Sequence, residues 1–442
     1  MESSLWLLLV LIATLAIIHI IQAQDQEGFI SLDCGLPGNE LSPYIETNTK
    51  LNFSSDGTFI ESGKTAKIQE DRLQKPYKTI RYFPDGIRNC YNLNVQMGRK
   101  YLIRASFIYG NYDGSDSTFV FDLYLGPNLW ATIDSGTWVD GSIREDILHI
   151  PTSNLLQICL VKTGDTTPLI SALELRPMGN DSYITKSGSL KLHERYYLSK
   201  YSSDIYDRIW ESYFKTEWSQ ISTDLDVVNS NKYDPPKDVL KNAATPTNAS
   251  EPLTMEWIPI KPDDQYCYYA HFAEIQDLQA NETREFNVLW NGVQQSGPFI
   301  PRMRIIDTIS SMSPQICSGG KCIFQLIRTN RSTLPPLLNA LEVYTAVQFP
   351  TSETDESDVG AIKNIAATYA LNRISWQGDP CVPQQFRWDG LNCNNTDMSM
   401  PPRITTLNLS SSGLTGTIAA AIRNLAQLET MDLSNNNLTG GL

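Results

Sequence analysis

The stretch YGNYDGSD, residues 109–116, has the residue types best suited to ligand chemistry in this chain. Aromatic rings stack on the apolar faces of sugars, and carboxylates accept hydrogen bonds from sugar hydroxyls. Tyr109, Tyr112, Asp113 and Asp116 would supply both functions at the end of a predicted strand. These residues are a candidate carbohydrate-binding site, although ordinary turn residues around a packed tyrosine are the favoured interpretation. Calcium binding is not expected, because the later Glu of an EF-hand-type loop is missing.

Motifs for catalysis are not found elsewhere in the sequence. The four histidines, His19, His149, His193 and His271, lie far apart and have no neighbours at metal-ligand spacing. The sequence has no GxSxG, P-loop or HExxH motif. It also lacks the glycine-rich, HRD-type and DFG motifs of a kinase. We therefore expect a chain that binds without catalysing, and we expect no metal or cofactor.

Composition limits the class of protein. With 442 residues the chain should form two to four domains. Its 41% hydrophobic and 10% aromatic residues are typical of ordered globular proteins. The formal net charge of -14 and the lack of a basic stripe argue against nucleic-acid binding, which depends on clustered Lys and Arg.

The beginning of the sequence predicts secretion. Residues 5–21 form an apolar run, and Ala23 ends a possible cleavage site, so residues 1–23 resemble a signal peptide. Because this run is shorter than a typical spanning helix, we expect membrane association only through an uncleaved signal or through segments missing from this sequence. Eight Asn-x-Ser/Thr triplets predict glycosylation outside the cell, at Asn52, Asn180, Asn248, Asn281, Asn330, Asn394, Asn408 and Asn437.

The eight cysteines suit an oxidising compartment. Cys317 and Cys322 flank SGGK and could close a hairpin tip, and Cys381 and Cys393 are close enough to close a small loop. The other four allow three connectivities. Among these we expect Cys34 to pair with Cys90, with Cys159 and Cys267 as buried thiols.

Alternating apolar residues predict β-structure in two successive regions. In FVFDLYL, Phe119 and Phe121 point one way while Val120 and Asp122 point the other. Several of these positions recur 165 residues later, so that Tyr101, Ala105, Phe107 and Phe121 correspond to Tyr266, Ala270, Phe272 and Phe286. A constant offset over several strands indicates a duplicated fold. Two-sheet sandwiches are the simplest architecture for such bodies.

The region from Gly28 to Thr345 resembles a tandem malectin-like domain. The resemblance rests on FISLDCGLP at Phe29, YFPDGIRNCYNL at Tyr82, DIYDRIW at Asp204 and two strands ending in ALE-type sequences. It implies two jelly-roll-like β-sandwich modules, which we place at residues 24–180 and 193–347 with a linker at 181–192. Malectin holds a glucose disaccharide with loop aromatics and an aspartate, and the loop at 109–116 is similar in kind.

From residue 348 onwards, the sequence no longer shows the alternating pattern of the two β-rich regions. An acidic linker at 348–358 could be a hinge or a site of regulated cleavage, and a plain spacer is the favoured interpretation. A helix is predicted at 359–371, capped by Ser357 or Asp358. GDPC at residues 378–381 resembles the tetrapeptide of plant receptor kinases with malectin-like ectodomains, in which this region is associated with release of the malectin-like part. Residues 359–402 would form the cap of the repeats.

Leucine-rich repeats are predicted at residues 403–442. Leu407, Leu409, Leu414 and Gly416 correspond to Met431, Leu433, Leu438 and Gly440, 24 residues later, and Asn436 occupies the ladder position that Ser412 takes in the first copy. Two copies are too few for a stable solenoid, so we expect a longer gene product, a truncated sequence or a splice form.

The fold class expected is mainly β: two malectin-like sandwiches, a helical and disulfide-bonded cap, and incomplete repeats. The resemblance implies the extracellular recognition region of a plant leucine-rich repeat receptor-like serine/threonine kinase, which binds a cell-wall carbohydrate, a peptide or a co-receptor. We expect the groove between the modules to be the binding surface. The alternatives are a secreted decoy and an accessory module of a carbohydrate-active enzyme.

Overall fold

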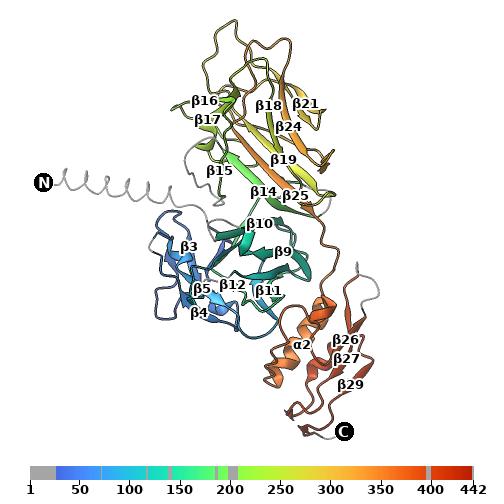
Figure 1. Ribbon diagram of the computed structural model, residues 1–442. Coiled ribbons are helices and arrows are strands. Elements are labelled where there is room, and N and C mark those ends of the chain that lie inside the picture. Colours follow the sequence, from blue (N-terminus) through green and yellow to red (C-terminus); the bar gives the residue numbers. More distant parts are fainter. Residues whose placement is uncertain are drawn as a thin grey trace, which may run out of the picture.

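The computed structural model describes residues 26–70, 72–115, 118–137, 142–184, 188–197, 208–394 and 400–440. Two β-rich modules and a smaller C-terminal region follow one another along the molecule (Figure 1). The predicted signal peptide, residues 1–23, lies outside the described residues, and so does Asp116. Within the described ranges, no helix has both the length and the apolar character needed to cross a bilayer.

The first module is a sandwich whose core follows the predicted alternation. Tyr101, Ile103, Ala105 and Phe107 of β7 (Tyr101–Ile108) are buried in one core with Phe121 of β8 (Val120–Leu125). The mainly β fold class is therefore confirmed. The other strands of this module are β1 (Ile30–Asp33), β2 (Tyr44–Ile45), β3 (Asn52–Ser55), β4 (Lys64–Lys67), β5 (Thr79–Tyr82), β6 (Arg88–Asn94), β9 (Asn128–Asp134), β10 (Ser142–His149), β11 (Leu155–Lys162), β12 (Leu169–Ile170) and β13 (Ala172–Pro177).

The second module repeats this arrangement. Its four-stranded sheet has the order β18-β24-β20-β21, which corresponds to β6-β11-β8-β9 in the first module. Tyr266, Ala270, Phe272 and Phe286 are buried as their counterparts are, in agreement with duplication. The strands are β14 (Ser189–Tyr197), β15 (Glu211–Ser212), β16 (Trp218–Ser222), β17 (Asn242–Pro246), β18 (Leu253–Trp257), β19 (Gln265–Phe272), β20 (Phe286–Trp290), β21 (Val293–Phe299), β22 (Asp307–Ser310), β23 (Gln315–Ile316), β24 (Cys322–Arg328) and β25 (Ala340–Val347).

The two modules share one continuous sheet. In the order β13-β7-β10-β14-β25-β19, strand β10 of the first module pairs with β14, and Leu148 lies opposite Leu190. Strand β14 begins at Ser189, inside the linker predicted at 181–192. Because main-chain hydrogen bonds join the modules edge to edge, this junction is not a flexible connector (Figure 1).

Buried charges cross the same junction. Arg195 of β14 lies 3.5 Å from Asp146 of β10 and 2.9 Å from Glu342 of β25, and all three side chains are almost fully buried. Asp146 also pairs with Arg104 of β7 at 2.7 Å. Tyr183 and other apolar side chains pack beside this row and fill the junction. The expected binding groove between the modules is therefore occupied here by the protein's own side chains.

His149 of β10 makes the junction sensitive to pH. Its Nδ1 is hydrogen-bonded to Ser189 Oγ at 2.8 Å, its ring lies 5.8 Å from that of Phe349, and Glu353 lines the same crevice. Burial lowers the pKa of His149 to about 4. The folded state favours the neutral ring. The contribution of His149 to the free energy of unfolding is therefore fully present above pH 6.5 and is lost as the pH falls towards 4.

We expect His149→Gln, which cannot titrate, to reduce the loss of stability between pH 7 and pH 5 by about 2 kcal/mol. Urea unfolding at both pH values measures this difference. Groups far from His149 are the same in the two proteins, so their titration cancels in the comparison. An unchanged pH dependence in the variant would contradict the assignment.

The C-terminal region contains α2 (Glu356–Thr368) and the cap of the repeats. The helix begins earlier than predicted, and its N-cap is Asp355, which accepts a hydrogen bond from Ser357 N at 3.0 Å. Asp358 is instead buried against Arg403, with Nη2 to Oδ1 at 2.8 Å. The remaining strands are β26 (Leu391–Asn394), β27 (Arg403–Asn408), β28 (Thr415–Gly416), β29 (Thr430–Asp432) and β30 (Asn437–Leu438). The short 3-10 helices are η1 (Asp56–Thr58), η2 (Lys75–Tyr77), η3 (Ser135–Thr137), η4 (Val239–Lys241), η5 (Gln384–Phe386) and η6 (Ala420–Asn424).

Asn436 forms the expected ladder contacts between the two repeats. Its side-chain oxygen accepts from Ser412 N at 3.0 Å and Leu414 N at 2.9 Å, and its nitrogen donates to Leu409 O at 2.8 Å. Ser412 plays a different part, because its hydroxyl accepts from Arg373 Nη2 at 2.5 Å. The serine thus ties the first repeat to the cap.

The disulfides correct one predicted pairing. The structure joins Cys317 to Cys322 and Cys381 to Cys393, but it pairs Cys90 with Cys159 and leaves Cys34 and Cys267 as buried thiols. The expected pair of Cys34 with Cys90 was wrong, and so was the expectation of a thiol at Cys159. Alternation along β6 explains why: Tyr91 faces the core that contains Cys34, whereas Cys90 lies on the opposite face of the sheet, in a second buried cluster with Cys159 of β11.

Candidate ligand-binding site

The predicted sugar-binding loop is satisfied largely by its own contacts. Tyr109 Oη donates to the Asp113 carboxylate and lies 2.8 Å from Ser115 Oγ. The Tyr112 ring packs 4.9 Å from Tyr82 and 5.5 Å from Tyr109, and both loop tyrosines are half-buried. Burial raises the pKa of Tyr112 to about 12. Of the four predicted residues, three are brought together, while Asp116 lies outside the described residues; sugar binding by this loop stays a prediction.

A cavity of about 500 Å³ lies next to this loop in the first module. Its size is within the range of small-ligand sites. The lining comes from the end of β1, the loops before β3, strand β4 and the segment leading into β5. These residues are Asp33, Leu36, Glu40, Glu46, Thr47, Asn48, Lys67, Ile68, Arg72, Leu73, Gln74, Lys75, Lys78 and Thr79.

Ile68 forms a wall shared by the cavity and the loop. Gly110 has a positive φ of 51°, and a Cβ there would lie 2.2 Å from Ile68 Cγ2. Glycine is therefore required for the loop backbone to approach the wall this closely. The loop and the cavity therefore lie side by side in the first module.

The acidic side chains of the cavity are held in place by hydrogen bonds. Asp33 is buried and accepts from Tyr44 Oη at 2.6 Å and Thr79 Oγ1 at 2.5 Å. Burial raises the pKa of Asp33 to about 6, so the carboxyl group is increasingly neutral below that pH. Glu46 is also buried, and it accepts hydrogen bonds from the Asn48 and Thr49 main-chain nitrogens at 2.8 and 2.7 Å.

Basic side chains lie around the same cavity. Lys75 Nζ is 3.7 Å from Glu40 and 3.9 Å from the centroid of the Tyr44 ring, and Lys67 Nζ is 3.2 Å from Glu40. Arg72 and Lys78 complete the set of four basic residues, compared with three acidic ones. In a chain with a net charge of -14, this slight local excess of basic residues suits a polar ligand that carries an acidic group.

The cavity was not predictable from the sequence, because its residues come from several short segments. Asp33 and Thr79, for example, are 46 positions apart in the sequence, and a hydrogen bond joins their side chains in the folded chain. One signal was available: Lys67, Arg72, Lys75 and Lys78 cluster within an otherwise acidic chain.

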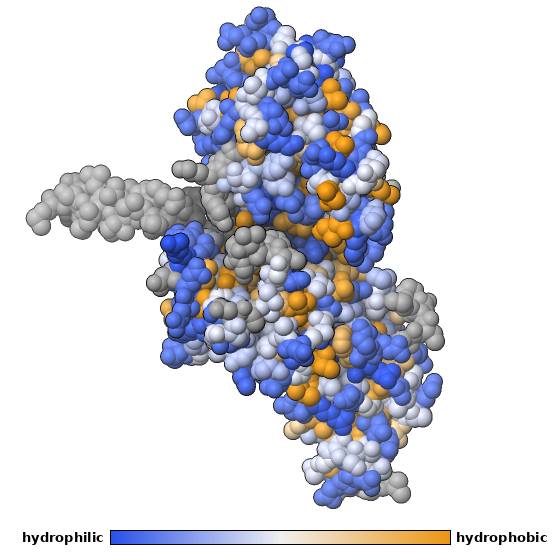
Figure 2. Space-filling model, in the orientation of Figure 1, coloured by the Kyte–Doolittle hydropathy of each residue, from blue (hydrophilic) through white to orange (hydrophobic). Residues whose placement is uncertain are grey.

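All eight predicted glycosylation positions lie on the surface, as glycan attachment requires: Asn52, Asn180, Asn248, Asn281, Asn330, Asn394, Asn408 and Asn437. Figure 2 shows a mostly hydrophilic surface with scattered hydrophobic residues on the face in view. Occupancy of these positions stays a prediction.

Comparisons with known proteins agree with this architecture. The Malectin-like domain family matches residues 32–346, and the Leucine Rich Repeat family matches residues 427–442. A probable LRR receptor-like serine/threonine-protein kinase of Arabidopsis thaliana is 67% identical over 438 residues, which cover 97% of this chain and 49% of that protein. A receptor-like protein kinase of the same plant is 66% identical, covering 97% of this chain and 50% of the relative. The chain thus spans about half the length of these relatives.

Solved structures show the same fold. The crystal structure of the ANX2 ectodomain from Arabidopsis thaliana has a TM-score of 0.60 at 18% identity, covering 73% of this chain and 97% of that one. A chain in the crystal structure of the plant peptide RALF23 in complex with FER and LLG2 has a TM-score of 0.58 at 17% identity. The match covers 72% of this chain and 95% of that one. Together with the twin sandwiches and the repeats, these matches show that the chain belongs to the malectin-like family and corresponds to the ectodomain portion of leucine-rich repeat receptor-like serine/threonine kinases.

Proposed function

We propose that this chain is the extracellular ligand-recognition region of a plant receptor-like kinase. The observation that carries the proposal is the alignment of 97% of the chain with about half of each kinase relative, at 67% identity for one of them. In such a receptor, this region would bind the ligand and another part of the protein would transfer phosphate. A secretory route to the cell surface is supported by the signal-like residues 1–23 and the surface position of the predicted glycosylation sites.

The ligand proposed is a peptide or cell-wall carbohydrate that carries an acidic group and binds in the cavity of the first module. Its basic residues and apolar wall support this choice, and the carboxyl group of Asp33 becomes neutral as pH falls below about 6. The structural relative FER is found with a peptide and with a second protein, LLG2. By analogy we propose that a second protein acts as co-receptor for this chain.

The test uses the secreted chain against immobilised panels of plant peptides and oligosaccharides, with biolayer interferometry as the readout. For a ligand that binds, Lys75→Glu combined with Lys78→Glu should weaken binding at least about 10-fold, since each reversal replaces attraction with repulsion. The control is Lys232→Glu with Lys237→Glu in the second module, where Lys232 likewise lies over a tyrosine ring, that of Tyr233. Equal binding by both double variants would exclude the cavity as the site.

The same assay tests the loop beside the cavity. Tyr112→Ala with Asp113→Ala should weaken carbohydrate ligands if the loop contacts sugars. A carbohydrate that binds this variant as tightly as the unchanged chain does not use the loop.

A further inference from the structure

The GDPC turn lies against the first module, far from it in sequence. Arg88 of β6 donates from Nη1 to Val382 O at 3.2 Å and from Nη2 to Asp379 O at 2.8 Å and Phe386 O at 2.9 Å. Only 6% of Arg88 is exposed. Burial lowers the pKa of Arg88 to about 10, although the nearby charge of Asp379 acts to raise it. One buried guanidinium thus binds three main-chain carbonyls of the repeat cap.

The surfaces around Arg88 fit closely. Gly378 has a φ of 68°, and a Cβ at this position would lie 2.8 Å from Cys90 Sγ and 3.0 Å from Arg88 Cζ. The Phe386 ring packs 5.9 Å from the ring of Tyr124, and the Arg88 guanidinium lies 5.7 Å from the Phe386 centroid. The disulfide between Cys90 and Cys159 therefore forms part of the surface on which the glycine sits.

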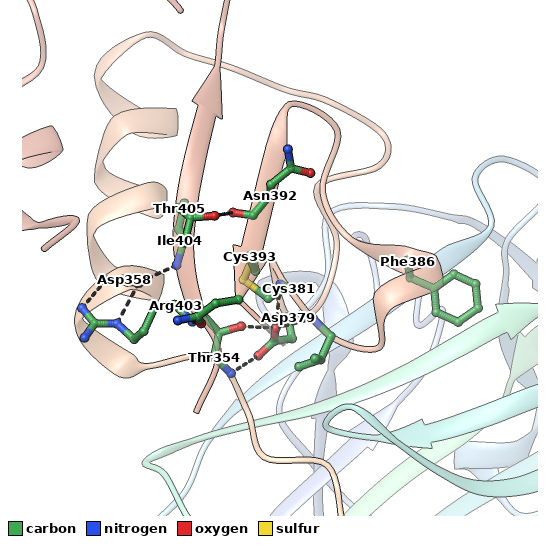
Figure 3. The surroundings of a disulfide bond; sticks show 12 residues. Thr354, Asp358, Asp379, Cys381, Phe386, Asn392, Cys393, Arg403, Ile404 and Thr405 are labelled. Atoms are coloured by element: carbon green, nitrogen blue, oxygen red, sulfur yellow. Dashed lines mark hydrogen bonds and ion pairs between the residues drawn. A yellow bond between two sulfur atoms is a disulfide. The ribbon is translucent and has the colours of Figure 1, made fainter. Parts of the chain in front are cut away.

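Asp379 connects the turn to the segment that enters α2. Its carboxylate accepts from Cys381 N and Val382 N at 2.9 Å each, and from Thr354 N at 2.8 Å as well as the Thr354 hydroxyl (Figure 3). Thr351, a few residues earlier, exchanges two hydrogen bonds with Asn128 of the first module at 2.9 and 3.0 Å. The predicted acidic linker is thus held along its length.

The cap is in turn fixed to the repeats. The disulfide of Cys381 and Cys393 joins the turn to β26, and Asp358 of α2 pairs with Arg403 and accepts from Ile404 N at 2.8 Å (Figure 3). A continuous series of contacts therefore runs from β6 through the turn to β27.

We propose that the GDPC turn is a lock, closed by Arg88, that holds the repeat region on the first malectin-like module independently of the chain that connects them. Cleavage of the connecting segment alone then leaves the two parts associated, and their separation requires that the Arg88 contacts open. This inference concerns the assembly of the region and does not depend on which ligand it binds.

The experiment inserts a protease recognition sequence after the exposed Pro350 in the full chain, cuts it, and measures co-elution of the fragments by gel filtration at micromolar concentration. The cut fragments of the otherwise unchanged chain should elute together. With Arg88→Leu they should separate, because loss of three charge-assisted hydrogen bonds should weaken association by about two orders of magnitude. Arg99→Leu, in the same module but beside Gly28, is the matched control and should not separate.

Separation of the unchanged fragments, or co-elution of the Arg88→Leu fragments, would overturn the lock. Non-reducing peptide maps showing the disulfide between Cys90 and Cys159 verify that the first module of each variant is folded. If Arg88→Leu is not secreted, Gly378→Val tests the same contact from the cap side, and its fragments should also separate.

Discussion

Replacing Glu342 by glutamine is expected to lower the free energy of unfolding by about 3–5 kcal/mol. The carboxylate is completely buried and accepts from Arg195 Nε at 2.9 Å, Tyr183 Oη at 2.6 Å and Tyr344 Oη at 2.7 Å. Although burial acts in the opposite direction, nearby Arg208 and Arg195 hold the pKa of Glu342 well below its usual range. Without this charge, the buried guanidinium groups of Arg195 and Arg208 lose part of the negative charge that balances them at the junction of the modules.

Urea unfolding followed by tryptophan fluorescence at pH 7 measures this effect. The matched control is Glu256→Gln in the same module, where the carboxylate pairs with Lys321 at 2.7 Å and both side chains are well exposed. That change should cost less than about 1 kcal/mol. A similar small cost for both variants would show that the buried row does not stabilise the junction.

Removing the disulfide of the first module, with Cys90→Ala and Cys159→Ala together, is expected to cost about 4 kcal/mol. The two cysteines are 69 residues apart, so the bond restricts a long loop of the unfolded chain. The Cys90 sulfur also lies under Gly378, so the contact with the cap should loosen. Secreted yield and urea unfolding measure the loss.

The disulfide between Cys317 and Cys322 provides the comparison, because it closes a separation of only five residues. Removing it should cost about 2 kcal/mol in the chain-entropy description. If the short disulfide proves the more important of the two, loop closure does not govern the stability of this chain.

Much of the fold was predictable because its signals are local. Phe119, Phe121 and Leu123 alternate with residues of the opposite face, and this alternation requires only a pleated strand. The duplication was visible because equivalent strands retain the same buried residues, such as Phe107 and Phe272. The repeat spacing likewise predicted the ladder contacts of Asn436.

The candidate site was only partly predictable. The loop with Tyr109, Tyr112 and Asp113 was found from its residue types, but residue types do not reveal that its groups bond to one another. The cavity depends on which segments the sheets bring together, and spacing along the chain does not contain that information. The partner of Cys90 was missed for the same reason, since only the pairing of β6 with β11 places Cys159 opposite it.

The strands, their in-and-out alternation, the duplication and the repeats were predictable from the order of neighbouring residues, because each is a local property of the chain. Tertiary structure decided that two sandwiches join through β10 and β14, that Arg195 lies between Asp146 and Glu342, and that Arg88 holds the GDPC turn. Hydrogen bonds and ion pairs between distant segments have no preferred separation along the chain. Their partners are chosen when distant strand edges and surfaces meet, and burial then makes those contacts strong.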